Sequence, residues 1–153
     1  MLPTPNTFSL ATGHSEGGAR LTAFDAALLD AGLGNLNLLK VSSVIPPGAR
    51  LVPVPAIAPG SLAPVAYGAV TSVIEGEIIS AGVAVGLSRD TFGMIMEYSG
   101  CCPRHQTEAI LEEMLRESFD RRGLDLDSAM VKAVEHKVIR CGCAFAAVAL
   151  WYE

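Results

Sequence analysis

Two segments of the chain carry apolar residues every three or four positions, which is the spacing of an amphipathic helix. The first is Leu21–Ala31, and Gly32 follows it as a stop signal. The second and clearer one is Thr107–Arg122, whose polar face carries several acidic residues and which ends before Gly123. The sequence therefore predicts two substantial helices that lie far apart in the chain.

Shorter apolar runs bounded by Gly, Pro and Ser predict β-strands. The predicted strands cover Asn6–Ala11, Asn35–Val44, Tyr67–Ile74, Glu77–Leu87, Thr91–Tyr98, Met130–Arg140 and Cys143–Trp151. A Gly-rich loop is expected at Gly13–Gly18, a Pro-rich coil at Pro53–Pro64, and a turn at Glu75-Gly76 that joins two of the strands. No linker, repeat or low-complexity segment divides the sequence. Residues 1–153 are therefore predicted to form one α+β domain, a sandwich of mainly antiparallel β-sheets covered by helices (αββα-like).

Composition narrows the class of protein. Half of the residues are hydrophobic and only 18% are charged, which favours burial of some apolar surface between subunits. The net charge of -5 argues against nucleic-acid binding, which needs a basic face, and suits a cationic small molecule better. The chain shows no signal-peptide pattern, and apolar stretches such as Cys143–Tyr152 are too short to span a bilayer. We expect a cytoplasmic protein that binds neither nucleic acid nor membrane.

The four cysteines leave more than one interpretation open. Cys101, Cys102, Cys141 and Cys143 could form two disulfides, or a zinc site together with His105. Neither a Cys-Cys pair nor a Cys-Gly-Cys run has the two-residue gap that lets two thiolates share one tetrahedral ion easily. We therefore expect reduced, mostly buried thiols and no metal site.

The most unusual local feature is the pair Ser42-Ser43 at the end of a predicted strand, with Pro46-Pro47 close behind. A peptide bond held beside a rigid turn can store strain. If the Ser43 hydroxyl attacks the Ser42 carbonyl carbon, an N-to-O acyl shift gives an ester. β-Elimination then releases the upstream chain and leaves dehydroalanine at position 43. Hydrolysis of the dehydroalanine releases ammonia and leaves a pyruvoyl group. By itself the pair favours an ordinary strand end, where serines are common, and only its surroundings change that interpretation.

The surroundings of this pair belong to a longer pattern whose order and spacing are specific. Its segments are Leu21–Gly34, Asn35–Pro47, Met94–Gly100, Glu135-His136 and Gly142–Tyr152. Through most of its length the chain resembles the pyruvoyl-dependent arginine decarboxylases. It diverges in the Pro-rich segment after Leu51 and at Cys101-Cys102.

The resemblance implies self-cleavage into a small chain, residues 1–42, and a large chain, residues 43–153. The mature protomers are expected to assemble into a trimer or a multiple of it, with active sites between neighbouring subunits. The covalent pyruvoyl cofactor, derived from Ser43, would form a Schiff base with L-arginine and yield agmatine and carbon dioxide.

The resemblance also implies roles for individual residues. Ser42 would become the new carboxyl terminus, Asn37 would act near the cleavage site, and Glu97 would act near the pyruvoyl group. Asp25 would bind the substrate guanidinium, for which two carboxylate oxygens suit a bidentate pair. The pocket would be lined by Leu21, Leu28, Gly34, Leu36 and Val44.

Each of these polar residues also has an ordinary interpretation. Asp25 on a helix face could be a solvated surface carboxylate, and Glu97 could lie at a strand edge, which would avoid the cost of an unpaired buried charge. Asn37 could bond the Ser42 carbonyl or simply a nearby turn. At the level of function, the alternatives are a decarboxylase of another amino acid, an unprocessed scaffold or ligand-binding relative, and a zinc-binding module.

Overall fold

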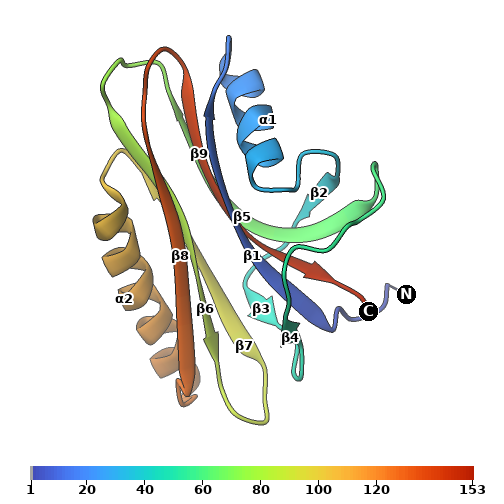
Figure 1. Cartoon of the computed structure of the whole chain (residues 1–153). Coiled ribbons are helices and arrows are strands. Elements are labelled where there is room, and N and C mark those ends of the chain that lie inside the picture. Colours follow the sequence, from blue (N-terminus) through green and yellow to red (C-terminus); the bar gives the residue numbers. More distant parts are fainter. Residues whose placement is uncertain (1) are drawn as a thin grey trace.

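The computed structural model describes residues 2–153, which form two β-sheets packed face to face with one helix on each outer side (Figure 1). The first sheet has the order β2-β5-β9-β1-β4, with β2 at Asn37–Lys40, β5 at Leu62–Ser72, β9 at Gly142–Trp151, β1 at Thr7–Glu16 and β4 at Arg50–Leu51. The second sheet has the order β3-β7-β6-β8, with β3 at Val44–Ile45, β7 at Gly93–Gly100, β6 at Ile78–Leu87 and β8 at Ser128–Lys137. Helix α1 spans Arg20–Asp30 and helix α2 spans Arg104–Arg122.

Most neighbouring strands run antiparallel; the two exceptions within residues 2–153 are the parallel pairs β1–β4 and β2–β5. The α+β sandwich expected from the sequence is therefore confirmed. Within residues 2–153, neither helix α1 nor helix α2 is both long enough and apolar enough to cross a membrane.

Strand β9 explains why the end of the sequence is almost continuously apolar. Its two edges pair with β5 and β1, and its two faces are covered by α1 and by the second sheet. Successive side chains of a strand point to opposite faces. Cys143, Phe145 and Ala147 pack in the cluster beneath α1, while Ala146 and Val148 face the second sheet. The many alanines on this strand let both neighbouring layers approach closely.

The helices follow the predicted apolar faces. In α1, Ala23, Ala27 and Leu28 are buried against the first sheet. The approach to β1 is so close that a Cβ atom added to Gly13 would lie 2.1 Å from the carbonyl oxygen of Ala27. Helix α2 buries its stripe on the second sheet and ends at Gly123, whose φ of 63° is the left-handed conformation that glycine adopts without steric cost.

Of three further local predictions, the structure confirms one and corrects two. The expected Gly-rich loop is partly strand, because β1 continues to Glu16. The predicted turn at Glu75-Gly76 is confirmed, and it joins β5 to β6, which belong to different sheets. The strand expected at Asn35–Val44 is divided into β2 and β3, which also lie in different sheets.

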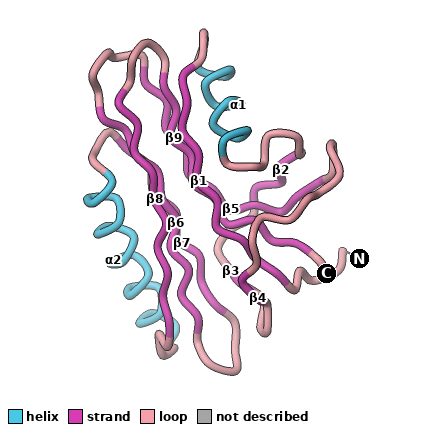
Figure 2. Tube along the Cα trace, in the orientation of Figure 1, coloured by secondary structure: helices cyan, strands magenta, loops and turns pink. Residues whose placement is uncertain are grey.

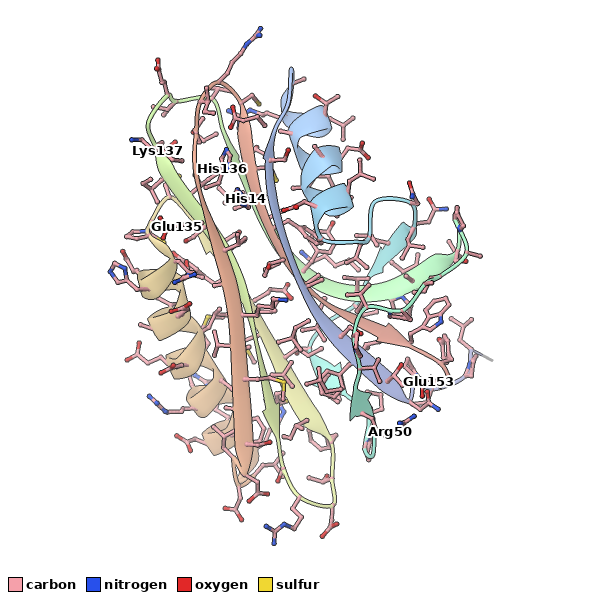
Figure 3. The ribbon with its side chains drawn as sticks, viewed as in Figure 1. His14, Arg50, Glu135, His136, Lys137 and Glu153 are labelled. Atoms are coloured by element: carbon pink, nitrogen blue, oxygen red, sulfur yellow. The ribbon has the colours of Figure 1, made fainter. Side chains whose placement is uncertain are left out.

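A polar cluster of His14, Glu16 and His136 joins the two sheets near one end of the sandwich (Figure 3). The Nδ1 atoms of His14 and His136 lie 2.8 Å apart, and Nε2 of His136 lies 2.5 Å from Oε2 of Glu16. Because a carboxylate can only accept, His136 donates to Glu16. Oε1 of Glu16 also accepts from the backbone N–H groups of Arg140 at 2.7 Å and Cys141 at 3.0 Å.

These donors determine the protonation of Glu16. Burial by itself raises the pKa of Glu16, but the hydrogen bonds from the Arg140 backbone, the His136 side chain and the Ile139 and Cys141 backbones lower it from 4.5 to about 2. A folded-state pKa below the unfolded value stabilises the fold above about pH 4.5, and this stabilisation is lost as the pH falls toward 2.

We therefore predict that Glu16→Gln lowers the free energy of unfolding at pH 7, and that its difference from the wild type shrinks as the pH falls below 4.5. Urea denaturation at several pH values measures the difference. Glu112→Gln is the matched control, because Glu112 pairs with Arg116 on the exposed surface of α2 and should change stability little at any pH. A Glu16→Gln deficit that grows toward low pH would contradict the assignment.

Candidate functional site

The chain crosses from the first sheet to the second at residues 41–43, which lie outside the strands between β2 and β3 (Figure 2). On one side of the crossing, the Val41 N–H donates to the Val65 carbonyl of β5 at 3.1 Å. On the other, the Ile95 N–H of β7 donates to the Ser43 carbonyl at 2.8 Å. The Ser42–Ser43 peptide bond therefore lies between two anchored points, one on each sheet.

A cavity of about 340 Å³ lies beside this peptide bond. It is lined by Ser42, Ser43, Ile95, Met96, Glu97 and Met114. The structure thus brings together three of the residues predicted for the site, Ser42, Ser43 and Glu97, in mostly apolar surroundings. Helix α2 contributes Met114, and β7 contributes the acid.

Glu97 is placed by the alternation of β7. Ile95, two residues before it, packs in the core between the sheets, so Glu97 points to the same side, toward the edge of the first sheet. Burial raises the pKa of the Glu97 carboxyl group, and the charge of Lys40 acts in the opposite direction without cancelling the effect. A carboxyl group that holds its proton more firmly than a free glutamate is suited to act as a general acid.

Lys40 belongs to the same site, although it was not predicted from the sequence. Its Nζ lies 3.8 Å from Oε1 of Glu97 and 4.6 Å from the centroid of the Tyr67 ring. The signal was present in the sequence, since Lys40 is the only charged residue of the segment Asn35–Val44. Met114 gave no such signal, because an apolar residue on the inner face of a helix is typical of core packing.

Asn37 lies at the start of β2, three residues before Lys40. Its Nδ2 donates to the Gly60 carbonyl at 2.9 Å, so of the two bonds expected for this side chain the structure shows the one to a nearby turn. Its backbone N–H donates to the Ser61 carbonyl. These bonds fix the start of the parallel pair β2–β5.

The remaining predicted residues lie elsewhere in the protomer. Asp25 and Leu21 are exposed on α1, while Leu28 is buried beneath the helix. Gly34 and Leu36 line a separate cavity of about 180 Å³ beyond the end of α1. Val44, at the start of β3, is half exposed. Within one protomer, therefore, Asp25 and the residues predicted to line its pocket do not line the cavity at Ser43.

The cysteines are free thiols, of which Cys102, Cys141 and Cys143 are buried and Cys101 is exposed. Cys102 lies among hydroxyl groups, 3.5 Å from Ser80 Oγ and within hydrogen-bonding distance of Thr107. Among residues 2–153, no three His, Cys, Asp or Glu side chains gather in a way that could hold a metal ion.

Fold and site together describe a sandwich in which a serine pair crosses between sheets beside a partly buried acid. A family model described as pyruvoyl-dependent arginine decarboxylase matches residues 7–153. A protein of that name from Methanocaldococcus jannaschii is 49% identical over 151 residues, covering 97% of this chain and 92% of the relative. Another, from Methanothermobacter thermautotrophicus, is 38% identical over 143 residues, covering 92% of this chain and 93% of the relative.

The chain therefore belongs to the pyruvoyl-dependent arginine decarboxylase family. The resemblance noted in the sequence is confirmed, and with it the class of protein, an enzyme of a family that depends on a pyruvoyl cofactor.

Proposed function

We propose that this protein is a proenzyme that cuts itself between Ser42 and Ser43 and then decarboxylates L-arginine to agmatine and carbon dioxide. The observation that carries the proposal is that Ser42, Ser43 and Glu97 line one cavity at the crossing between the sheets. The names of the relatives supply the substrate and the cofactor. Nothing in those names favours a non-catalytic scaffold or another amino acid. A cytoplasmic location stays a prediction.

The residues of the crossing fit a pyruvoyl group derived from Ser43. Ser43 lies outside the strands and beside free volume, so its side-chain atoms can change without breaking a strand pair. Its carbonyl is held by the Ile95 N–H, and Val44 after it pairs with Met94. When formed, the group supplies an electron sink for the negative charge that decarboxylation leaves on the α-carbon.

Cleavage at this position would keep the fold intact. The small chain, residues 1–42, would contain β1, α1 and β2, and the large chain the other elements. Strand β1 pairs with β9 of the large chain along its whole length, from Thr7 to Glu16. The two chains would therefore stay together without a covalent link.

We assign distinct roles to the two acids. Glu97, in its apolar cavity, returns a proton to the α-carbon after carbon dioxide has left. Asp25, exposed on α1, binds the guanidinium group of arginine through paired, charge-assisted hydrogen bonds. Asn37 keeps its predicted role near the cleavage site, where its contacts with the turn at Gly60 would fix the strand that leads to Ser42.

The separation of Asp25 from Ser43 within one protomer supports a site shared between neighbouring subunits. Leu21 and Val44, predicted to line the pocket, are 76% and 45% exposed, so within one protomer neither is enclosed in a pocket. In a trimer, the α1 surface of one protomer would cover the Ser43 cavity of its neighbour. Such an arrangement would bury these apolar side chains and complete the site.

The first test concerns processing. The purified protein should separate under denaturing conditions into residues 1–42 and residues 43–153, the latter with a blocked amino terminus. Ser43→Ala should remain one intact, inactive chain, because no hydroxyl group is left to attack the Ser42 carbonyl. Denaturing mass spectrometry distinguishes the forms, and cleavage of Ser43→Ala at the same bond would refute the mechanism.

The second test separates the two acids. Glu97→Gln keeps the size of the side chain but removes the acid, so turnover should fall on the order of 10²- to 10⁴-fold while cleavage persists. Asp25→Asn should instead weaken arginine binding by about 1.5–3 kcal/mol and narrow the preference for arginine over uncharged analogues. Steady-state kinetics with both substrates measures this. Equal losses for arginine and its analogues in Asp25→Asn would remove Asp25 from the guanidinium site.

The third test asks whether the acids of one site come from two subunits. If the protein is a trimer, random mixed trimers of the Glu97→Gln and Asp25→Asn chains, made by co-expression, would regain about one quarter of the wild-type sites, because half of the chains supply each intact acid. Activity at limiting arginine should therefore exceed that of either variant alone. A mixture no more active than the better single variant would place both acids in one protomer.

A further inference from the structure

Lys40 occupies a special position with respect to the crossing between the sheets. It is the last residue of β2 and lies two positions before Ser42. Its ammonium group is the partner of Glu97, at 3.8 Å from Oε1, although the two residues belong to different sheets. The ion pair therefore links the two sheets at the place where the chain passes from one to the other.

Both ends of this pair are fixed by the strands that carry them. The backbone of Lys40 pairs with Val65 of β5, and Glu97 pairs with Val83 of β6. The ammonium group also lies over the face of Tyr67, where the π electrons attract a cation. The Tyr67 ring is in turn packed by its neighbours, with ring centroids 6.2 Å from Phe24 and 5.5 Å from Phe145.

The pair differs from the arginine–glutamate ion pairs that bridge neighbouring turns of α2. Those pairs, such as Arg116–Glu112 and Arg121–Glu117, lie on the surface four residues apart, where ion pairs contribute little. The Lys40 side chain is 56% exposed, but the Glu97 side chain is only 30% exposed and lines a mostly apolar cavity. A charge acts more strongly there because less water screens it.

Few charged groups surround Glu97 in the described part of the chain. Lys40 of β2 forms an ion pair with Glu97, and the ring of Tyr67 on β5 contacts Lys40 in turn. The neighbours on β6 and α2 are the apolar residues Val83 and Met114. The hydroxyl groups of the crossing line the same cavity. Lys40 is accordingly the group that opposes the effect of burial on the pKa of Glu97.

We propose that Lys40 is a positioning residue that holds the Glu97 carboxyl group at the Ser43 cavity and adjusts how readily it gives up its proton. The proposal rests on the role of Glu97 as the proton donor. A donor must lose and regain its proton in each turnover, and it works best when neither state is strongly favoured. Burial makes the proton of Glu97 harder to release, and the nearby ammonium group acts in the opposite direction.

The direct test does not require turnover. In the Ser43→Ala protein, which cannot form the pyruvoyl group, the Glu97 carboxyl can be titrated by ¹³C NMR, with its signal assigned by its loss in Glu97→Gln. Adding Lys40→Met should move the midpoint of the Glu97 titration to higher pH, because the charge that lowers the pKa is gone. Lys40→Arg should keep the midpoint near its original value.

Lys132→Met is the matched control, because Lys132 is exposed on β8, at the other edge of the second sheet. It should leave the Glu97 midpoint unchanged. An unchanged midpoint in Lys40→Met, or an equal shift in Lys132→Met, would overturn the proposal. Lys40→Gln, measured in the same way, provides the test if the methionine variant does not fold.

In the cleaved enzyme, Lys40→Met should lower kcat on the order of tenfold on the acid side of the alkaline limb, where Glu97 is protonated, since Glu97 becomes a weaker acid. The alkaline limb of the kcat profile should move to higher pH, with KM for arginine little changed and with rescue by Lys40→Arg. A purely structural role would change stability but not the position of this limb. Should Glu97→Gln retain full turnover, the donor role would fail while the NMR titration would still decide whether Lys40 controls Glu97.

Discussion

The crossing of the backbone at residues 41–43 is the constraint on which the site depends. Strand β2 must pair with β5 in the first sheet, and β3 must pair with β7 in the second, with only three residues between them. Buried backbone groups need partners, so each flank of the crossing is bonded to its own sheet. The peptide bond in the middle belongs to neither strand, and it lies beside an open cavity that residues of β7 and α2 help to line.

The rest of the molecule serves to hold this edge in place. The central position of β9 fixes β5 on one side and β1 on the other, and β5 carries both β2 and the aromatic ring that supports Lys40. The second sheet is held by α2, whose buried stripe packs on Met94 and Ala84. Glu97 is thus carried by a rigid strand, which is how an acid is kept at a defined distance from a reacting group.

The sequence predicted single elements well and their pairing less well. Both helices begin and end close to the expected residues, because helical periodicity and terminal glycines are local signals. The division of Asn35–Val44 was not predicted, since Leu36, Leu38 and Leu39 continue the apolar pattern up to Lys40 and the break is decided by which sheet each half joins. The same reason explains why β5 and β6, though joined by a short turn, form no hairpin.

For the site, the residues by themselves left ordinary interpretations open, and the family pattern selected Ser43 and Glu97. That these two line one cavity depends on contacts between residues more than 50 positions apart, which no local spacing contains. Lys40 was missed because a lone lysine on a strand is typical of a solvent-facing position. Its contact with Glu97 becomes evident only when the strand from the other sheet is placed beside it.

The full-length pairing of β1 with β9 has a consequence for how the protein could refold after cleavage. In a single uncut chain, β1 would find β9 as part of the same polypeptide, at the high effective concentration that a tether provides. After cleavage, the same contact would have to form between two separate polypeptides, and its formation would depend on their concentration. The cleaved protein would lack the covalent link that joined β1 to β9 when the chain folded. Its denaturation would therefore be far harder to reverse than that of an uncut chain.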